Sequence, residues 1–294
     1  MANLAVQSKR ISIHRIVDLD LFAIPLETIF PDGRIAALNP FAEALADRHV
    51  DFAAGKVLLT IQSHLLRFGG KTVLIDTCVG EHKARPLRPE WNQRSATGYL
   101  ANLAAAGCAP QDIDIVMCTH LHADHVGWNT RLESGRWVPT FPNARYVMSQ
   151  REIDQRAQEA ANSPAANHGS FQDSVLPILN AGLAQVQKPG DRIVDDALIV
   201  DLAGHAPGQI GLDVAAGRDA HFLFCGDAIH SPVQVFWPDW SSGFCLDRVQ
   251  AAQTRRALLR RAADEDLRLV PGHLRGMTMR VAERNGGFIP LLNN

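Results

Sequence analysis

The sequence predicts a mixed protein of the α/β or α+β class, built on layered sheets. Short β-rich runs alternate with helical patterns along the chain, and no repeat, low-complexity tract or long polar linker interrupts them. Of the 294 residues, 46% are hydrophobic and 20% are charged, which is the composition of a folded globular protein. This length allows one large domain or two small ones.

The first elements surround a hairpin. Residues 1–55 contain the turn-forming stretches FPDG and LNPF, and we expect this segment to be irregular. Residues 56–80 hold two β-rich runs on either side of Gly69 and Gly70, which predicts a β-hairpin. A helical pattern follows in residues 95–107, with Ser95 as the expected N-cap and Gly107 as the expected stop.

The rest of the chain alternates between strand and helix. Further strands are expected over residues 113–119, 144–149, 197–204, 221–227 and 267–273. One helix is expected over 150–160 with Ser149 as its cap, and a longer helix over 246–265.

Histidine and aspartate residues directly follow several of these β runs. The four positions are His120, His205, Asp227 and His273. Side chains in loops at strand ends can converge on one edge of a sheet. The sequence therefore predicts a functional site built from loops that lie far apart along the chain.

The stretch CTHLHADHVG, residues 118–127, concentrates metal-ligand side chains. His120 and His122 are two positions apart, a spacing that brings both side chains to the same side of an extended segment. Asp124 and His125 follow, where the chain can turn toward a second point. Imidazole nitrogens and carboxylate oxygens together favour zinc, iron or manganese over calcium. This pattern predicts a metal site.

Composition excludes several other classes of function. A formal net charge of −2 gives no electrostatic reason to expect nucleic acid or an anionic membrane as a partner. The apolar runs are too short to span a bilayer, and no signal peptide precedes them, so we expect a cytoplasmic protein. The five cysteines form no C-x-x-C pair, which predicts reduced thiols.

These motifs together resemble the metallo-β-lactamase superfamily. H-x-H-x-D-H is its signature, and GHAPGQ, FCGDAIH and VPGH are similar to its later ligand loops, while VLIDTCVG resembles its early strand. The resemblance covers residues 56–275. It implies a four-layer αββα sandwich, which we expect to form a single domain over residues 56–294. The apolar residues of the preceding N-terminal segment, residues 1–55, are expected to form a flap over the site or a dimer contact.

The resemblance also implies a binuclear metal centre. One ion would take His120, His122 and His205, and the other would take Asp124, His125 and His273. Asp227 would bridge the two ions together with a water or hydroxide, and Asp76 would orient a ligand histidine. The cofactors would be two divalent ions, with zinc favoured and manganese, iron or cobalt as alternatives.

Such a centre implies hydrolysis by direct attack of a hydroxide that bridges the metals. The favoured substrate is a small neutral, partly apolar ester or lactone, as in the acyl-homoserine lactonases of the superfamily. The alternative is an organophosphate or aryl ester hydrolase similar to methyl parathion hydrolase. A mono-iron enzyme similar to the persulfide dioxygenases and a non-catalytic metal-binding module are further alternatives.

Further residues are expected to act around this centre. Asp124, Asp227 and His230 are the expected catalytic residues, with His230 standing where lactonases often carry a tyrosine and donating to the developing oxyanion, or else packing the pocket wall. The resemblance implies a homodimer. The predicted substrate pocket contains aromatic residues that would otherwise pack in the core or at the dimer contact: Trp128, Phe236, Trp237 and Trp240.

Overall fold

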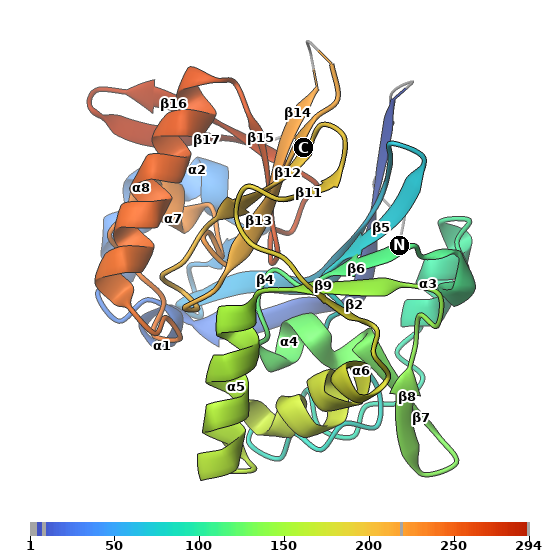
Figure 1. The fold of residues 1–294 in the computed structure, drawn as a ribbon. Helices are drawn as coiled ribbons and strands as arrows, with labels where there is room; N and C mark the ends of the chain where they lie inside the picture. Colours follow the sequence, from blue (N-terminus) through green and yellow to red (C-terminus); the bar gives the residue numbers. More distant parts are fainter. Residues whose placement is uncertain (1–4, 8–9, 218–219, 293–294) are drawn as a thin grey trace. The chain divides into compact units, whose positions relative to one another are not determined.

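The computed structural model describes residues 5–7, 10–217 and 220–292 (Figure 1). Contacts within the chain divide it into two compact units. The first unit comprises Met1–Leu19 and Ile61–Lys188, and the second comprises Asp20–Thr60 and Pro189–Asn294. Both units combine a sheet with helices, so the mixed α/β class predicted from the sequence is confirmed.

The larger sheet, most of which belongs to the first unit, runs in the order β1-β2-β4-β5-β6-β9-β10. Strand β3 pairs with the start of β4 within residues of the second unit. Strands β5, β6, β9 and β10 are parallel neighbours, so their carboxyl ends lie at one edge of the sheet. The strands are β1 (Ala5–Gln7), β2 (Ile11–Pro25), β3 (Val50–Asp51), β4 (Lys56–Phe68), β5 (Lys71–Ile75), β6 (Ile115–Met117), β9 (Arg145–Met148) and β10 (Ala184–Val186). A separate hairpin contains β7 (Thr130–Glu133) and β8 (Arg136–Pro139).

Helices of the first unit occupy the connections between these strands. They are α3 (Tyr99–Ala105), α4 (Ala123–Val126), α5 (Gln150–Asn162) and α6 (Leu176–Asn180), with short helical turns η2 (Pro110–Asp112), η3 (Gly127–Asn129), η4 (Ala166–Gly169) and η5 (Phe171–Val175).

The predicted hairpin is present between β4 and β5. Phe68 pairs with Lys71, so only Gly69 and Gly70 form the turn. Both glycines have positive φ angles, 58° and 73°, which this tight turn requires and which side-chain-bearing residues rarely adopt. The turn fixes the register of β5, whose end at Ile75 delivers Asp76 to the carboxyl edge of the parallel strands.

The second unit has a sheet in the order β11-β12-β13-β14-β15-β16-β17. The strands are β11 (Arg192–Val194), β12 (Ala197–Asp201), β13 (Ile210–Ala215), β14 (His221–Gly226), β15 (Arg268–Pro271), β16 (Met279–Arg284) and β17 (Gly287–Leu292). Its helices are α1 (Leu26–Ile29), α2 (Ala42–Leu45), α7 (Val233–Phe236) and α8 (Arg248–Asp264), with the short turn η1 (Ile35–Phe41).

Helix α8 is the crossover between the parallel strands β14 and β15, and Figure 1 shows it lying along the sheet that contains β16. The carboxylate of Asp247 caps its start by accepting a hydrogen bond of 2.9 Å from the amide of Gln250. Leu258, Leu259 and Ala262 on its inner face pack into the core of the sheet. This packing holds the carboxyl ends of β14 and β15 side by side.

Two local predictions were wrong. Residues 1–55 are not irregular, because they contain the 15-residue strand β2 together with α1, η1, α2 and β3. Helix α3 begins at Tyr99 after Gly98, which has a φ of 77°, so Ser95 is not its N-cap. Gly107 does follow the end of this helix, with a φ of 68°. Ser149 is the N-cap residue of α5, as predicted, although its side chain makes no capping hydrogen bond.

Two further expectations concern the whole chain. All five cysteines are free and buried, as predicted for reduced thiols. Within residues 5–7, 10–217 and 220–292, no helix has both the length and the apolar character that crossing a bilayer requires.

Candidate metal centre

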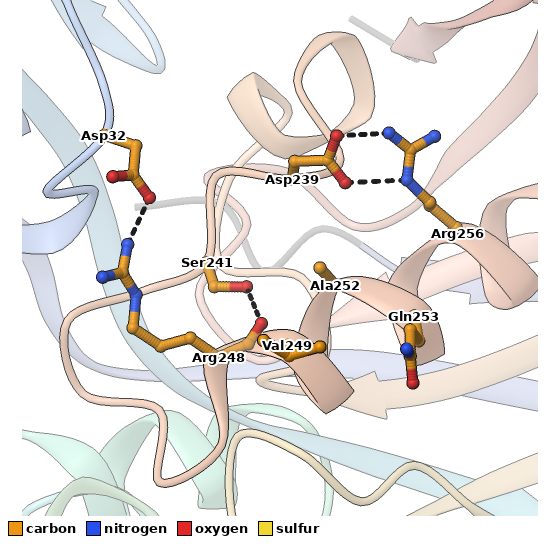
Figure 2. Close-up of a pocket in the computed structure, with 8 residues that line it drawn as sticks. All are labelled: Asp32, Asp239, Ser241, Arg248, Val249, Ala252, Gln253 and Arg256. Carbon is orange, nitrogen blue, oxygen red and sulfur yellow. Dashed lines mark hydrogen bonds and ion pairs between the residues drawn. The ribbon is translucent and has the colours of Figure 1, made fainter.

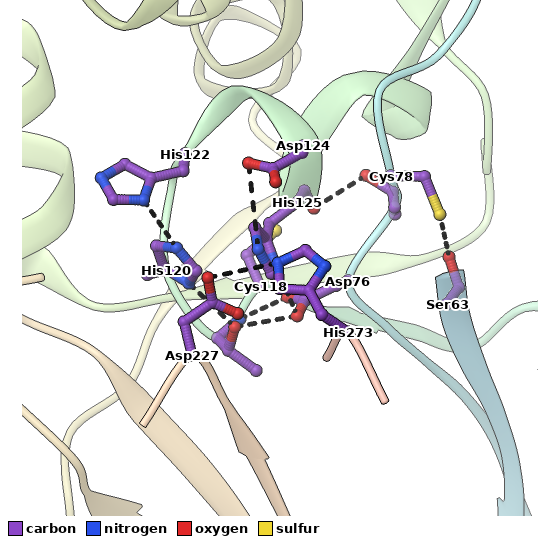
Figure 3. Close-up of polar contacts among 12 residues, drawn as sticks. Ser63, Asp76, Cys78, Cys118, His120, His122, Asp124, His125, Asp227 and His273 are labelled. Carbon is purple, nitrogen blue, oxygen red and sulfur yellow. Dashed lines mark hydrogen bonds and ion pairs between the residues drawn. The ribbon is translucent and has the colours of Figure 1, made fainter. Parts of the chain in front are cut away.

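The histidine cluster of the first unit follows β6 and leads into α4. His122 is the N-cap residue of α4 with an extended backbone, φ −71° and ψ 156°. The chain bends at Thr119 and His120, so the extended segment predicted from the spacing is present at His122 but not at His120. Nε2 of His120 is 2.9 Å from Nδ1 of His122. Asp124 and His125 lie on α4, where Nε2 of His125 is 3.9 Å from Oδ1 of Asp124 (Figure 3).

Two residues that no sequence motif indicates, Glu152 and Asn167, hold this loop in place. The amide of Leu121 donates to Oε2 of Glu152 at 3.1 Å, and the amide of Ala123 donates to Oδ1 of Asn167 at 3.1 Å. Asn167 returns a hydrogen bond of 2.6 Å from Nδ2 to the carbonyl of Leu121. Glu152 is fully buried on α5, so its carboxylate serves the loop rather than the solvent.

The carboxylate of Asp76 organises the same cluster from the end of β5. Its Oδ1 accepts a hydrogen bond of 2.7 Å from the amide of Thr119, and its Oδ2 accepts one of 2.9 Å from the Thr119 hydroxyl. Oδ2 is also 2.8 Å from Nδ1 of His125 (Figure 3). A carboxylate only accepts, so Nδ1 of His125 carries the hydrogen and Nε2 presents its lone pair.

A close approach of two backbones fixes the loop after Asp76 against the end of α4. The amide of Gly127 donates to the carbonyl of Cys78, and the amide of Trp128 donates to that of Thr77, both at 2.7 Å. A Cβ atom on Gly127 would lie 1.8 Å from the carbonyl oxygen of Val79. Only glycine fits at position 127, because any side chain would force these two segments apart.

In the second unit, three histidines surround one carboxylate oxygen. Asp227 follows β14, and its Oδ2 lies 3.5 Å from Nε2 of His205, 3.2 Å from Nε2 of His230 and 3.3 Å from Nε2 of His273. His205 follows β12 and His273 follows β15. All four side chains are buried. The strand-end positions His205, Asp227 and His273, selected from the sequence, therefore lie together.

The other ring nitrogen of these histidines has a partner that fixes the ring. Nδ1 of His273 donates to the carbonyl oxygen of Thr60 at 2.9 Å, which directs the Nε2 lone pair toward Asp227. Nδ1 of His205 is 3.5 Å from Sγ of Cys245. Burial raises the pKa of the Cys245 thiol to about 11, so this sulfur is a neutral thiol at pH 7. No motif in the sequence points to Thr60 or Cys245 as a partner of these histidines.

Helix α8 supports the loop after Asp227 through Arg255. This fully buried guanidinium donates from Nε to the carbonyl of Ala228 at 2.8 Å and from Nη1 to the carbonyl of Pro238 at 2.6 Å. Burial lowers its pKa to about 10, which leaves it charged at pH 7. Cys225 lies in the apolar core, and burial raises the pKa of its thiol.

The donor atoms of the second unit fit a divalent cation. Ligand atoms of His205, Asp227 and His230 all lie within 4.8 Å of one another. Two ligands of a tetrahedral ion with bonds of about 2.1 Å are roughly 3.4 Å apart, which matches the contacts of 3.2–3.5 Å around Asp227 Oδ2. Imidazole nitrogen and carboxylate oxygen are ligands that zinc and similar ions accept.

The four aromatic residues predicted to line a substrate pocket differ in burial. Trp128 and Trp240 are buried, Phe236 is half-buried and Trp237 is exposed. Trp128 is buried in the first unit and stacks on Tyr99 at 5.0 Å between ring centroids. In the second unit, Phe236 stacks on Phe41 at 4.0 Å, and Trp237 on the buried Trp240 at 5.1 Å.

A pocket of about 440 Å³ in the second unit lies beside α8 (Figure 2). Two ion pairs flank it, one between Arg248 and Asp32 and one between Arg256 and Asp239. The remaining lining residues are Ser241, Val249, Ala252 and Gln253. None of the four predicted aromatic residues lines this pocket, so their place in a substrate pocket stays a prediction.

A model of the metallo-beta-lactamase superfamily matches residues 58–273, which is most of the chain. The chain belongs to the metallo-β-lactamase superfamily. The N-acyl homoserine lactonase AiiB of Agrobacterium fabrum is 23% identical over 289 residues, covering 92% of this chain and 97% of the relative. Membership and this relative support a metal-dependent hydrolase of the lactonase-like group.

Solved structures agree on the metallo-β-lactamase fold. The structure of hydrolase AbOPH in the beta lactamase superfamily covers 100% of this chain and 98% of its own, with a TM-score of 0.81 and 20% identity. The structure of AidC, a dizinc quorum-quenching lactonase in complex with the product N-hexanoyl-L-homoserine, has a TM-score of 0.76 and 21% identity, covering 100% and 98%. The metallo-β-lactamase fold predicted from the sequence is confirmed.

Proposed function

We propose that this chain is a di-metal hydrolase that cleaves a neutral, partly apolar ester or lactone. The observation that carries the proposal is the arrangement of three imidazole Nε2 atoms within 3.2–3.5 Å of one buried carboxylate oxygen, Asp227 Oδ2. Superfamily membership supports the further assignment of two ions. The proposed ligands are His120, His122, Asp124, His125, His205, Asp227 and His273.

The residues around these ligands suit rigid metal binding. Asp76 and Thr60 each hold the Nδ1 hydrogen of a histidine, so the Nε2 lone pair of His125 or His273 needs no rearrangement before it binds a cation. Two bound divalent cations would supply a water acidified to near-neutral pKa and a positive charge for the substrate oxygen. Five of the seven proposed ligands are buried and the other two, His122 and Asp124, are half-buried, which limits the access of competing solvent to the ions.

An apolar part of the substrate is supported by the segment after Asp227. Exposed apolar side chains gather there: Trp237, Phe244, Leu246 and Val249. This segment is tied to a proposed ligand, because the amide of Leu246 donates to the carbonyl of His205 at 2.9 Å. An acyl or aryl group bound on this surface would therefore lie close to a ligand loop. The curated relative and AidC, both lactonases by name, support a lactone as the first substrate to test.

The test is a hydrolysis screen on protein of measured metal content, comparing wild type with Asp227→Ala. Substrates are N-acyl homoserine lactones, simple lactones, aryl esters and phosphotriesters. We expect lactone or ester cleavage by the wild type with two ions per chain, and loss of both turnover and metal in the variant. Asp266→Asn, an exposed aspartate paired with Arg280, is the matched control. Full activity of Asp227→Ala would refute the proposal, and one iron per chain would favour a redox enzyme instead.

A small-molecule substrate is part of this proposal, while the homodimer and the cytoplasmic location stay predictions. Size-exclusion chromatography with light scattering measures the oligomeric state directly. A mass of twice 32.2 kDa would confirm the dimer, and a mass of 32.2 kDa would show a monomer.

A further inference from the structure

His230 stands beside the proposed metal centre without belonging to its seven ligands. Its side chain is 3% exposed, and its Nε2 lies 3.2 Å from Oδ2 of Asp227. The ring of His205 is 4.9 Å away, edge to face, and the ring of His273 is 6.0 Å away and nearly parallel. The ring centroid of Phe30 lies 6.5 Å from that of His230, and the two rings pack edge to face. Two other imidazoles, one carboxylate and an apolar ring therefore lie around His230.

Gln234 determines which nitrogen of His230 carries the hydrogen. The amide nitrogen of the Gln234 side chain donates to the carbonyl of Trp240 at 2.8 Å, which turns Oε1 toward His230. Oε1 accepts a hydrogen bond of 2.7 Å from the backbone amide of His230 and lies 3.4 Å from Nδ1 of its ring. Since Oε1 only accepts, Nδ1 carries the hydrogen and Nε2 presents a lone pair to Asp227.

A lone pair that faces a buried carboxylate oxygen at 3.2 Å needs a positive charge between the two atoms. A proton on Nε2 would meet this need for His230 alone. The same oxygen, however, also lies 3.3 Å from Nε2 of His273, whose hydrogen is on Nδ1. One multivalent cation can bind several such nitrogens at once, whereas a protonated, positively charged His230 would repel that cation.

We propose that His230 is a metal ligand in its own right, and that its Nε2 binds the cation held by His205 and Asp227. The inference deepens the proposed function and rests on it. The ligand atoms of these three residues lie within 4.8 Å of one another inside the second unit. Ligation by Nε2 excludes the role predicted for His230 from the sequence, because a nitrogen whose lone pair binds a cation cannot donate a hydrogen bond to an oxyanion.

The experiment titrates metal-free full-length protein with Co²⁺, using competition with a chelator and the visible absorption of the bound ion. Wild type is compared with His230→Gln and His230→Phe, each accepted only with the far-ultraviolet circular dichroism of the wild type. We expect either variant to bind one of two Co²⁺ ions about 100-fold more weakly and to show a changed ligand-field spectrum. The matched control is His221→Gln, a half-buried histidine of the same unit that pairs with Asp213.

The outcomes separate this inference from the proposed function. Two Co²⁺ ions bound by a folded His230 variant with wild-type affinity and spectrum would overturn the ligand role of His230, while the hydrolase proposal would stand. Failure of the wild-type protein to bind two ions would overturn the proposed centre itself. If only kcat falls and the affinity and spectrum of both ions are unchanged, His230 is the oxyanion donor and the ligand role is wrong.

Discussion

Oδ2 of Asp76 lies 2.8 Å from Nδ1 of His125, although 49 positions separate the two residues in the sequence. The contact exists because β5 and β6 are parallel neighbours, so the residues that follow them meet at one edge of the sheet. It fixes one tautomer of His125 without placing Asp76 among the proposed ligands. A variant that lacks this contact therefore tests how much the orientation of His125 contributes to metal binding, because no proposed ligand is removed.

We predict that Asp76→Asn lowers the affinity for one cation by about 10- to 100-fold while the fold is kept. The carboxylate accepts from the Thr119 amide, the Thr119 hydroxyl and His125, and an amide cannot accept all three hydrogens. Chelator competition measures the affinity. Asp114→Asn, a half-buried aspartate paired with Lys71, is the control. Unchanged affinity in Asp76→Asn would mean that His125 needs no such support.

The proposed ligands could be predicted from the sequence because the signal is local. His120, His122, Asp124 and His125 stand in one short motif, and the other candidates directly follow β runs that hydrophobic patterns reveal. Their supporting residues carry no such signal. Thr60 reaches His273 across 213 positions, and Cys245 reaches His205 across 40, so only the tertiary fold brings these pairs together.

The fold shows the same division between local and distant information. The β4–β5 hairpin was predictable because two adjacent glycines meet a local backbone requirement. Strand β2 was not predicted, although its apolar residues alternate with polar ones over much of its length, because the turn motifs FPDG and LNPF in residues 1–55 indicate irregular structure. The start of α3 was misplaced because Gly98, rather than a polar side chain, sets it.

The buried thiols lead to a second prediction. All five cysteines are buried, and burial raises the pKa of each thiol, to about 11 for Cys245. Because thiolate is the reactive form, native protein at pH 8 should react with less than about one equivalent of a thiol-specific disulfide reagent within minutes. In denaturant the same assay should count all five thiols. Rapid reaction of a native thiol, or fewer than five in denaturant, would contradict this expectation.

The third prediction concerns the close approach at Gly127. In Gly127→Ala the new Cβ would lie 1.8 Å from the carbonyl oxygen of Val79, so the two segments must separate and two backbone hydrogen bonds must lengthen or break. We expect the free energy of unfolding to fall by about 3 kcal/mol, together with weaker metal binding, because α4 carries Asp124 and His125. Thermal unfolding and metal titration measure the two effects.

A second glycine gives the control for this substitution. A Cβ on Gly287 would meet nothing closer than the Arg284 carbonyl at 3.8 Å, so Gly287→Ala should leave both quantities nearly unchanged. If Gly127→Ala binds metal and unfolds like wild type, the separation of residues 76–80 from α4 does not matter to the site.

The last prediction is a pH dependence of stability that comes from His64. Complete burial, aided by the charge of Arg15, lowers its pKa to about 3, against about 6.5 in an unfolded chain. Between these values the unfolded state binds a proton that the folded state excludes. The contribution of His64 to the free energy of unfolding is therefore fully present above pH 6.5 and is lost as the pH falls, by about 1.4 kcal/mol per pH unit.

Denaturant titrations at pH 7 and pH 5 should show that the free energy of unfolding falls by about 2 kcal/mol less in His64→Gln than in wild type. The exposed His82 provides the control variant His82→Asn, whose loss should equal that of wild type. Equal losses in wild type and His64→Gln would mean that His64 accepts its proton without unfolding.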